Sequence, residues 1–286
     1  MELSKEKQRK DIERFIQKMP SLSTTVAKVM EICSRTETSP NELNKVISLD
    51  PVLTGQVLKL INSAYYSLNS KVTSLTRAIT MLGMNTVKNM ALSTAIIRHV
   101  SGTKKSRALP TSKFWAHSIS TGVSAKLLGM AKGLAVMERE ELFLAGLLHD
   151  LGKVPFGDEY TEVLFRAKKE QLPLVEVERE LMGMDHQEVG LMIAEKWKLN
   201  EVISATISQH HGGASHNSVL GGQIAFVALG NIYSNIFDFG YAGDPFPLES
   251  ELEKNLDIVG LSLQEFGAIA GSVEEEIRKA QIFLQM

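Results

Sequence analysis

The stretch LLHDLGK, residues 147–153, decides how this chain folds and what it can do. It closes a run of apolar helical periodicity that predicts a helix over residues 140–151. His149 and Asp150 are neighbours, and neighbours on a regular helix point about 100° apart. Both can face one ion only if the helix unwinds there or if the ion lies at the helix end. Gly152 follows at once and permits such a distortion.

The histidines of the chain are concentrated around this stretch. Only seven occur in 286 residues, and five of them, all after residue 110, stand at helix-associated positions: His117, His149, His186, His210 and His211. Taken singly, each has a plainer explanation, because a lone helical histidine is usually a surface residue or a satisfied core residue. Together with Asp150 they form the donor set that Zn, Fe, Mn and Ni ions take from proteins. We therefore expect a shared pocket that holds a divalent transition metal.

Composition limits the class of protein. The hydrophobic fraction of 44% and the net charge of −2 are typical of a globular chain, and the charge gives no reason to expect DNA as a partner. Cys33 is the only cysteine, which excludes a disulfide framework and fits a reducing compartment. The charged N-terminus lacks the apolar core of a secretory signal, and no apolar run approaches the ~20 residues needed to cross a bilayer. We expect a cytoplasmic protein without a membrane partner.

Helix-capping signals recur along the chain and strand signals are poor. Four stretches pair a cap residue with a proline or a glutamate, at residues 39–42, 50–51, 185–188 and 262–265. No Asn-Gly or Asp-Gly hairpin occurs, so we predict an all-α fold. The polar stretch at residues 101–107 is the expected linker. We predict an N-terminal helical subdomain over residues 1–108 and a helical bundle with a C-terminal helical tail over residues 109–286.

The segment LLHDLGK, the upstream WAHS and the downstream DHQEVG and HH resemble the HD superfamily of metal-dependent phosphohydrolases. The spacing is most similar to the HD-GYP branch, in which such residues bind a centre of two or three metals. The resemblance implies the following metal ligands: His117, His149, Asp150, His186, His210 and His211. It also implies catalytic roles for Asp150 and for Lys153, which would face a substrate phosphate.

Two departures from that branch weaken the expectation of catalysis. The family's closing aspartate should fall in residues 229–233, where this chain has Asn231, and the Gly-Tyr-Pro loop after the double histidine is absent. An amide oxygen is a weaker, uncharged ligand than a carboxylate. We therefore expect an incomplete centre that binds at most one ion tightly.

A second pattern covers the N-terminal part of the chain. The strings LDPVL at 49–53, LKLINSAYY at 58–66 and AITMLG at 78–83 resemble the HDOD family, the HD-related output domain of bacterial signalling proteins. The resemblance spans roughly residues 15–240 and implies an N-terminal helical subdomain packed beside an HD-like bundle. In that family the HD residues are often eroded and an asparagine commonly stands at the position of Asn231.

Two functions follow. The first is a bacterial signal-transduction module that acts through a protein partner or a nucleotide second messenger and keeps an incomplete metal site. The second is a metal-dependent phosphohydrolase of a nucleotide or a cyclic dinucleotide, and the sequence leaves open whether the chain is an enzyme. An iron-based redox or oxygen sensor is a third, weaker possibility, because nothing distinguishes iron from zinc or manganese.

Overall fold

The structure, a computed structural model, describes residues 2–35, 38–101, 107–244 and 249–285. These residues form helices and connecting segments without a strand, which confirms the predicted all-α fold. Most of the predicted linker lies outside the described residues. The chain forms two compact units that do not follow chain order: one contains residues 1–20 and 104–273, and the other contains residues 21–103 and 274–286. The domain boundary between residues 108 and 109 stays a prediction.

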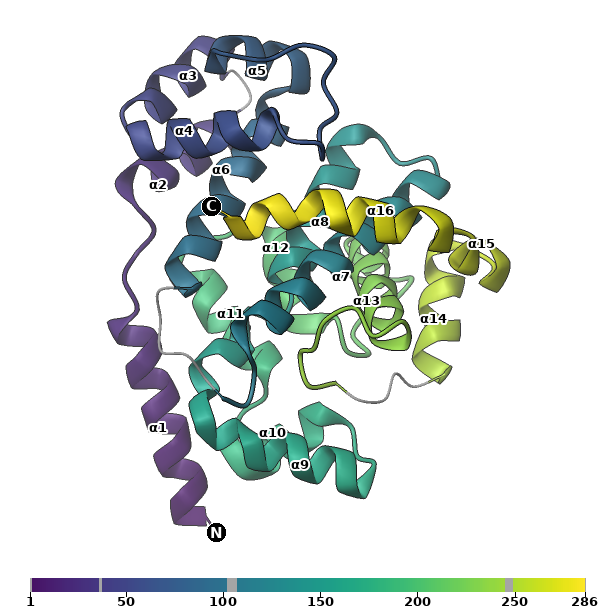
Figure 1. Cartoon of the computed structure of the whole chain (residues 1–286). Coiled ribbons are helices and arrows are strands. Elements are labelled where there is room, and N and C mark those ends of the chain that lie inside the picture. The colour runs from purple at the N-terminus through teal and green to yellow at the C-terminus, as the bar shows by residue number, and fades with distance from the viewer. Residues whose placement is uncertain (1, 36–37, 102–106, 245–248, 286) are drawn as a thin grey trace. The chain divides into compact units, whose positions relative to one another are not determined.

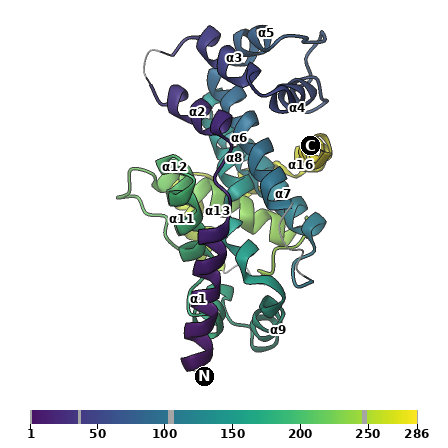
Figure 2. The ribbon, with the colours of Figure 1, turned by 90° about the vertical axis from the view of Figure 1, so that its left-hand side faces the viewer.

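The first unit holds Asp150 and the five histidines that the sequence pattern singles out. Its helices are α1 (Glu2–Lys18), α7 (Thr111–Ala131), α8 (Val136–Leu148), the 3-10 helix η1 (Leu151–Glu159), α9 (Tyr160–Glu170), α10 (Leu174–Met182), α11 (His186–Lys196), α12 (Glu201–Gln209), α13 (Gly221–Ile236), α14 (Glu249–Val259), α15 (Leu263–Ala268) and the start of α16 (Ala270–Ala280). Helix α7 packs against both α8 and α13 and is buried along most of its length (Figure 1). Helices α11 and α12 lie side by side (Figure 2).

Small residues let α7 and α8 approach closely. A Cβ atom on Gly122 would lie 2.5 Å from the backbone oxygen of Phe143, and one on Gly146 would lie 2.7 Å from the Cα of Gly122. Real Cβ atoms do not tolerate such separations, so both positions need glycine. The close approach brings His117, on α7, towards the end of α8, where His149 and Asp150 follow.

The second unit is a small helical bundle. It contains α2 (Thr24–Cys33), α3 (Pro40–Ser48), α4 (Pro51–Ile61), α5 (Leu75–Leu82), α6 (Met84–Ser101), the end of α16 and the 3-10 helix η2 (Gln281–Gln285). Helices α2, α4 and α5 each pack against α6 (Figure 1, Figure 2). Asp50 accepts a hydrogen bond from the backbone N–H of Leu53, which confirms its predicted role as a cap.

None of the helices in the described residues is long and apolar enough to cross a membrane.

Candidate metal centre

The end of α8 orients His149 and Asp150 together. The helix ends at Leu148, three residues before the predicted end at Leu151. His149 keeps helical backbone angles, whereas Asp150, at φ −96° and ψ 11°, leaves the helix, and η1 begins at the next residue. The change of direction at Asp150 lets the two side chains face one point. Unwinding was one of the two alternatives that the sequence left open, and the backbone leaves the helix at Asp150.

Gly152 has a role that differs from the expected one. It is not among the residues with positive φ, so it does not supply a left-handed turn. A Cβ atom at this position would instead lie 1.8 Å from the backbone oxygen of His186 and 2.5 Å from the backbone nitrogen of Gly190. The absence of a side chain lets η1 lie directly on the first turn of α11. This contact brings Asp150 to His186.

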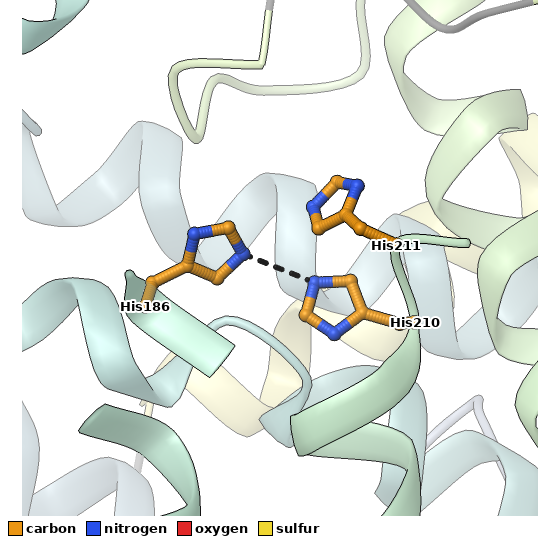
Figure 3. A group of neighbouring side chains, drawn as sticks. All are labelled: His186, His210 and His211. Atoms are coloured by element: carbon orange, nitrogen blue, oxygen red, sulfur yellow. Dashed lines mark hydrogen bonds between the residues drawn. The ribbon is translucent and has the colours of Figure 1, made fainter. Parts of the chain in front are cut away.

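The ends of two helices position the remaining histidines. Asp185 and Glu188 form the predicted capping box, which starts α11 so that His186 is its first residue. Helix α12 ends at Gln209, and His210 and His211 follow at its end. The side chain of Gln187 accepts a hydrogen bond of 3.0 Å from the backbone N–H of His211. His186, His210 and His211 thus face one another from the ends of two helices (Figure 3).

The carboxylate of Asp150 lies at the centre of the histidines. Its Oδ2 atom is 3.3 Å from His149 Nε2 and 3.8 Å from His117 Nε2. Its Oδ1 atom is 3.4 Å from His186 Nε2 and 3.6 Å from His210 Nε2. Two atoms that bind one tetrahedral ion at about 2.1 Å lie about 3.4 Å apart. The spacing fits shared ligands and is too long for most hydrogen bonds.

Hydrogen bonds on the outer face of the rings fix which nitrogen faces the centre. His149 Nδ1 donates to the backbone oxygen of Gly146 at 2.7 Å, and His210 Nδ1 donates to that of Ile207 at 3.0 Å. A carbonyl oxygen only accepts, so the proton of each neutral ring is on Nδ1 and Nε2 carries a lone pair. His186 Nδ1 lies 2.7 Å from the carboxylate of Glu178 in the same way. Such outer partners orient metal-binding histidines.

With the ring protons on Nδ1, the Nε2 atoms that face the centre have no proton to donate. The Nε2 atoms of His186 and His210 lie 3.2 Å apart and are joined by the dashed line in Figure 3; with the proton of each ring on Nδ1, neither atom can donate, and two lone pairs face each other. Among the described residues, three buried atoms of the centre make no hydrogen bond: His149 Nε2, Asp150 Oδ1 and His211 Nε2. Buried polar atoms in folded proteins nearly always have a partner. The donor set therefore fits a bound cation.

Lys153 is part of the same buried cluster. Its ammonium lies 2.8 Å from Asp150 Oδ2, and both side chains are fully buried. Burial would raise the pKa of Asp150, but its neighbours, among them the ammonium of Lys153 at 2.8 Å, outweigh burial and hold that pKa well below its usual range. Asp150 is therefore ionised, and one carboxylate oxygen is shared between the lysine and the ligand cluster.

We expect acid to destabilise the metal-free protein. Burial lowers the pKa of His117 to about 3 and also lowers the pKa values of His186, His210 and His211. Because the folded-state values lie below the unfolded one, the unfolded chain takes up more protons and stability is lost as pH falls below about 6.5. Each histidine contributes up to about 1.4 kcal/mol per pH unit. Between pH 7.5 and 5.5 the four histidines together would cost about 5 kcal/mol. Glu178 and Asp244 offset part of this, because burial raises their pKa values to about 7 and about 6 and the folded state therefore binds protons there over the same range. Urea unfolding should show a net loss of about 2 to 4 kcal/mol between pH 7.5 and 5.5; equal stability at both pH values would contradict the buried neutral histidines.

Sequence reasoning missed two carboxylates beside the centre. Glu178, on α10, contacts His186 through both its ring and its backbone N–H, and Tyr160 donates a hydrogen bond to it; burial raises the pKa of Glu178 to about 7. Asp244, in the segment after α13, lies with its Oδ2 atom 3.6 Å from His211 Nε2, and burial raises its pKa to about 6. No local pattern marks either residue, because both reach the site through tertiary contacts.

Asn231 stands where the resemblance places a closing aspartate. It is buried on α13, and a side-chain hydrogen bond with His117 opposes the lowering of the pKa of that histidine. It lines a small cavity of about 40 Å³ together with His210, His211, Asp244 and Glu251. This volume holds a water molecule or an ion and is far below the ~300 Å³ of small-molecule pockets.

Comparison with known proteins identifies the family. The HDOD domain model matches residues 19–212. An HDOD domain protein of Geobacter sulfurreducens with a solved structure is 26% identical, covers 97% of both chains and has a TM-score of 0.77. A candidate phosphohydrolase from Shewanella amazonensis SB2B shares the fold, with a TM-score of 0.68. It is 21% identical, and the match covers 94% of this chain and 97% of that one.

A curated relative, an uncharacterized protein of Treponema pallidum (strain Nichols), is 26% identical over 200 residues, which is 68% of this chain. The matched region is 38% of that relative, so the chain spans well under half of its length. The family match covers more than half of the present chain and includes every histidine of the centre. The chain belongs to the HDOD domain family.

Proposed function

We propose that this protein is a signal-transduction module in which the histidine and aspartate cluster holds a divalent transition metal for structure and regulation. The proposed ligands are His117, His149, Asp150, His186, His210 and His211. The bound ion would satisfy the facing lone pairs of the inner nitrogens and tie the end of α8, the start of α11 and the end of α12 to α7. Output would pass through a protein partner; a nucleotide second messenger is the alternative that the sequence left open.

The observation that carries this proposal is the burial of the centre. His149, Asp150 and His186 have no exposed surface, and His117 and His210 are 1% and 2% exposed. Hydrolysis of a phosphodiester needs an open coordination position and room for the substrate. The cavity of about 40 Å³ beside His210 and His211 has room for a water molecule or an ion and not for a phosphodiester. A closed set of protein ligands is typical of structural metal sites.

Two further proteins with similar structures carry names that correspond to the two candidate functions. A protein of Marinobacter aquaeolei VT8, with a TM-score of 0.71 and 17% identity, is named as a candidate signal transduction protein. A second protein of Shewanella amazonensis SB2B, with a TM-score of 0.60 and 20% identity, is named as a candidate metal-dependent phosphohydrolase. At these identities the likeness shows the fold alone, so the choice between the two activities rests on the site.

The second candidate function is a metal-dependent phosphohydrolase, and one observation favours it. Lys153 and Asp150 form a buried pair beside two groups of metal-ligand atoms, His117–His149–Asp150 and His186–His210–His211. Such an arrangement has the residue types that clamp and activate a phosphate and a water molecule. In this case Asp150 and Lys153 would be catalytic, and the centre would have to open.

A turnover assay separates the two functions. We expect that the protein with added Mn²⁺ hydrolyses bis(p-nitrophenyl) phosphate no faster than an Asp150→Ala variant, because the buried centre excludes the substrate. The same samples should show a higher melting temperature with Mn²⁺ for the unchanged protein only, since a ligand of the folded state stabilises it. Mn²⁺-dependent turnover that disappears in the variant would establish the hydrolase instead.

A further inference from the structure

The two groups of ligand atoms differ in negative charge. The group of His117 and His149 contains Asp150, whose Oδ2 atom is already paired with Lys153. The group of His186, His210 and His211 has no carboxylate of its own, and Asn231 stands where the resemblance places one. The carboxylate oxygen that reaches it is Oδ1 of Asp150, at 3.4 Å from His186 Nε2 and 3.6 Å from His210 Nε2. One carboxylate, shared between both groups and Lys153, leaves most of the charge of a divalent cation uncompensated in a buried site. A second carboxylate is therefore the missing component.

Asp244 is placed to supply it. Its Oδ2 atom lies 3.6 Å from His211 Nε2, and both side chains are 12% exposed. The separation matches the ~3.4 Å expected for two ligands of one tetrahedral ion. His211 Nε2 is buried and makes no hydrogen bond among the described residues, so it is free to bind an ion. Asp244 and Asn231 line the same small cavity as His210 and His211.

The segment that carries Asp244 is built into the first unit. Gly240 has a φ of +81°, and a Cβ atom there would lie 2.3 Å from the backbone nitrogen of His117. The next residue, Tyr241, donates a backbone hydrogen bond of 2.9 Å to Lys113, and Ala242 is buried. The positive φ and the close approach both require glycine at position 240. Asp244 thus reaches the histidines from a segment that is anchored to α7 at Gly240 and Tyr241.

We propose that Asp244 is the carboxylate ligand of the His186–His210–His211 group, in place of the family's closing aspartate, and that metal binding fastens the segment 239–244 to the end of α12. This inference rests on the proposed metal centre and deepens it. It makes the position of a surface-proximal segment depend on the ion, which is the kind of local change that a partner protein can read.

The test compares metal affinity across matched variants. Four metal-free proteins are each titrated with Zn²⁺ by calorimetry. They are the unchanged chain, the single variants Asp244→Asn and Asp257→Asn, and the double variant Asp244→Asn with Asn231→Asp. Asp257 is the control, because its side chain is 80% exposed and pairs only with the exposed His216 among the described residues. We expect Asp244→Asn to weaken binding at least about tenfold, the lower end of the loss seen when support of a metal site is removed. Asn231→Asp should restore most of the affinity, because it returns a carboxylate to the same cavity.

Amide hydrogen exchange gives a second readout, because losing the negative charge of Asp244 without losing a metal contact would not change the effect of Zn²⁺ on exchange in residues 239–244. Zn²⁺ should slow amide exchange in residues 239–244 of the unchanged chain and of Asp257→Asn, and it should leave exchange in Asp244→Asn unchanged. If the unchanged chain binds Zn²⁺ and loses it in His186→Ala, while Asp244→Asn binds as tightly as the control, the Asp244 assignment is wrong and the metal centre stands. If the unchanged chain binds no Zn²⁺, both proposals fail.

Discussion

Asp150→Ala is expected to abolish metal binding and to destabilise the protein by about 3 to 5 kcal/mol, the usual cost of removing one partner of a buried ion pair. Asp150 lies within 3.8 Å of the Nε2 atoms of four histidines, so its loss removes the carboxylate that the ligands share. It also leaves the ammonium of Lys153 buried without its partner at 2.8 Å. Urea unfolding and elemental analysis of the purified variant measure the two effects.

A double variant separates the two causes. Asp150→Ala with Lys153→Met removes the uncompensated charge, so stability should recover by several kcal/mol while the metal stays absent. The exposed substitution Asp257→Ala is the control and should change neither quantity. Wild-type metal content in Asp150→Ala would show that this carboxylate is not a ligand.

Gly152→Ala is expected to cost more than about 4 kcal/mol or to prevent folding, a loss reserved for severe steric conflict. The added methyl group would lie 1.8 Å from the backbone oxygen of His186 and 2.5 Å from the backbone nitrogen of Gly190, and backbone atoms cannot turn away as a side chain can. Separation of η1 from α11 would also move Asp150 from His186, so metal content should fall. Thermal and urea unfolding measure the first effect.

Gly222→Ala is the matched control, since Gly222 lies on α13 and a Cβ atom there meets nothing within 4 Å. It should be neutral or stabilise by up to about 1 kcal/mol, because alanine favours a helix over glycine. If Gly152→Ala is as stable as this control, then η1 and α11 do not approach as closely as described.

The fold followed from local signals because capping and periodicity act over a few residues. The capping boxes at Asp185 and Ser262 start helices as predicted. The all-α class was therefore accessible from these local signals, and the HDOD family was accessible from the resemblance of the strings at residues 49–53, 58–66 and 78–83. The end of α8 was misplaced by three residues, because the apolar pattern continues through Leu151 while the backbone turns at Asp150. Periodicity reports burial and does not report where a helix stops.

The candidate site was predictable only in part. The histidines and Asp150 converge as their clustering in sequence suggested, although their role as metal ligands stays a prediction. Gly152 was noticed for the wrong reason, since its function is a tertiary close approach. Glu178 and Asp244 were missed because each comes from an element that carries no recognisable motif and reaches the histidines only through the fold.

The most direct test of the metal centre is elemental analysis of the protein purified without chelators and without a nickel column. The facing lone pairs of His186 and His210 and the buried, unpaired atoms of His149 and Asp150 predict at least about one equivalent of iron, manganese or zinc per chain, retained because a closed set of protein ligands releases its ion reluctantly. A protein that is folded and carries less than about 0.1 equivalent of any transition metal, and that takes up none when it is added, would contradict the account.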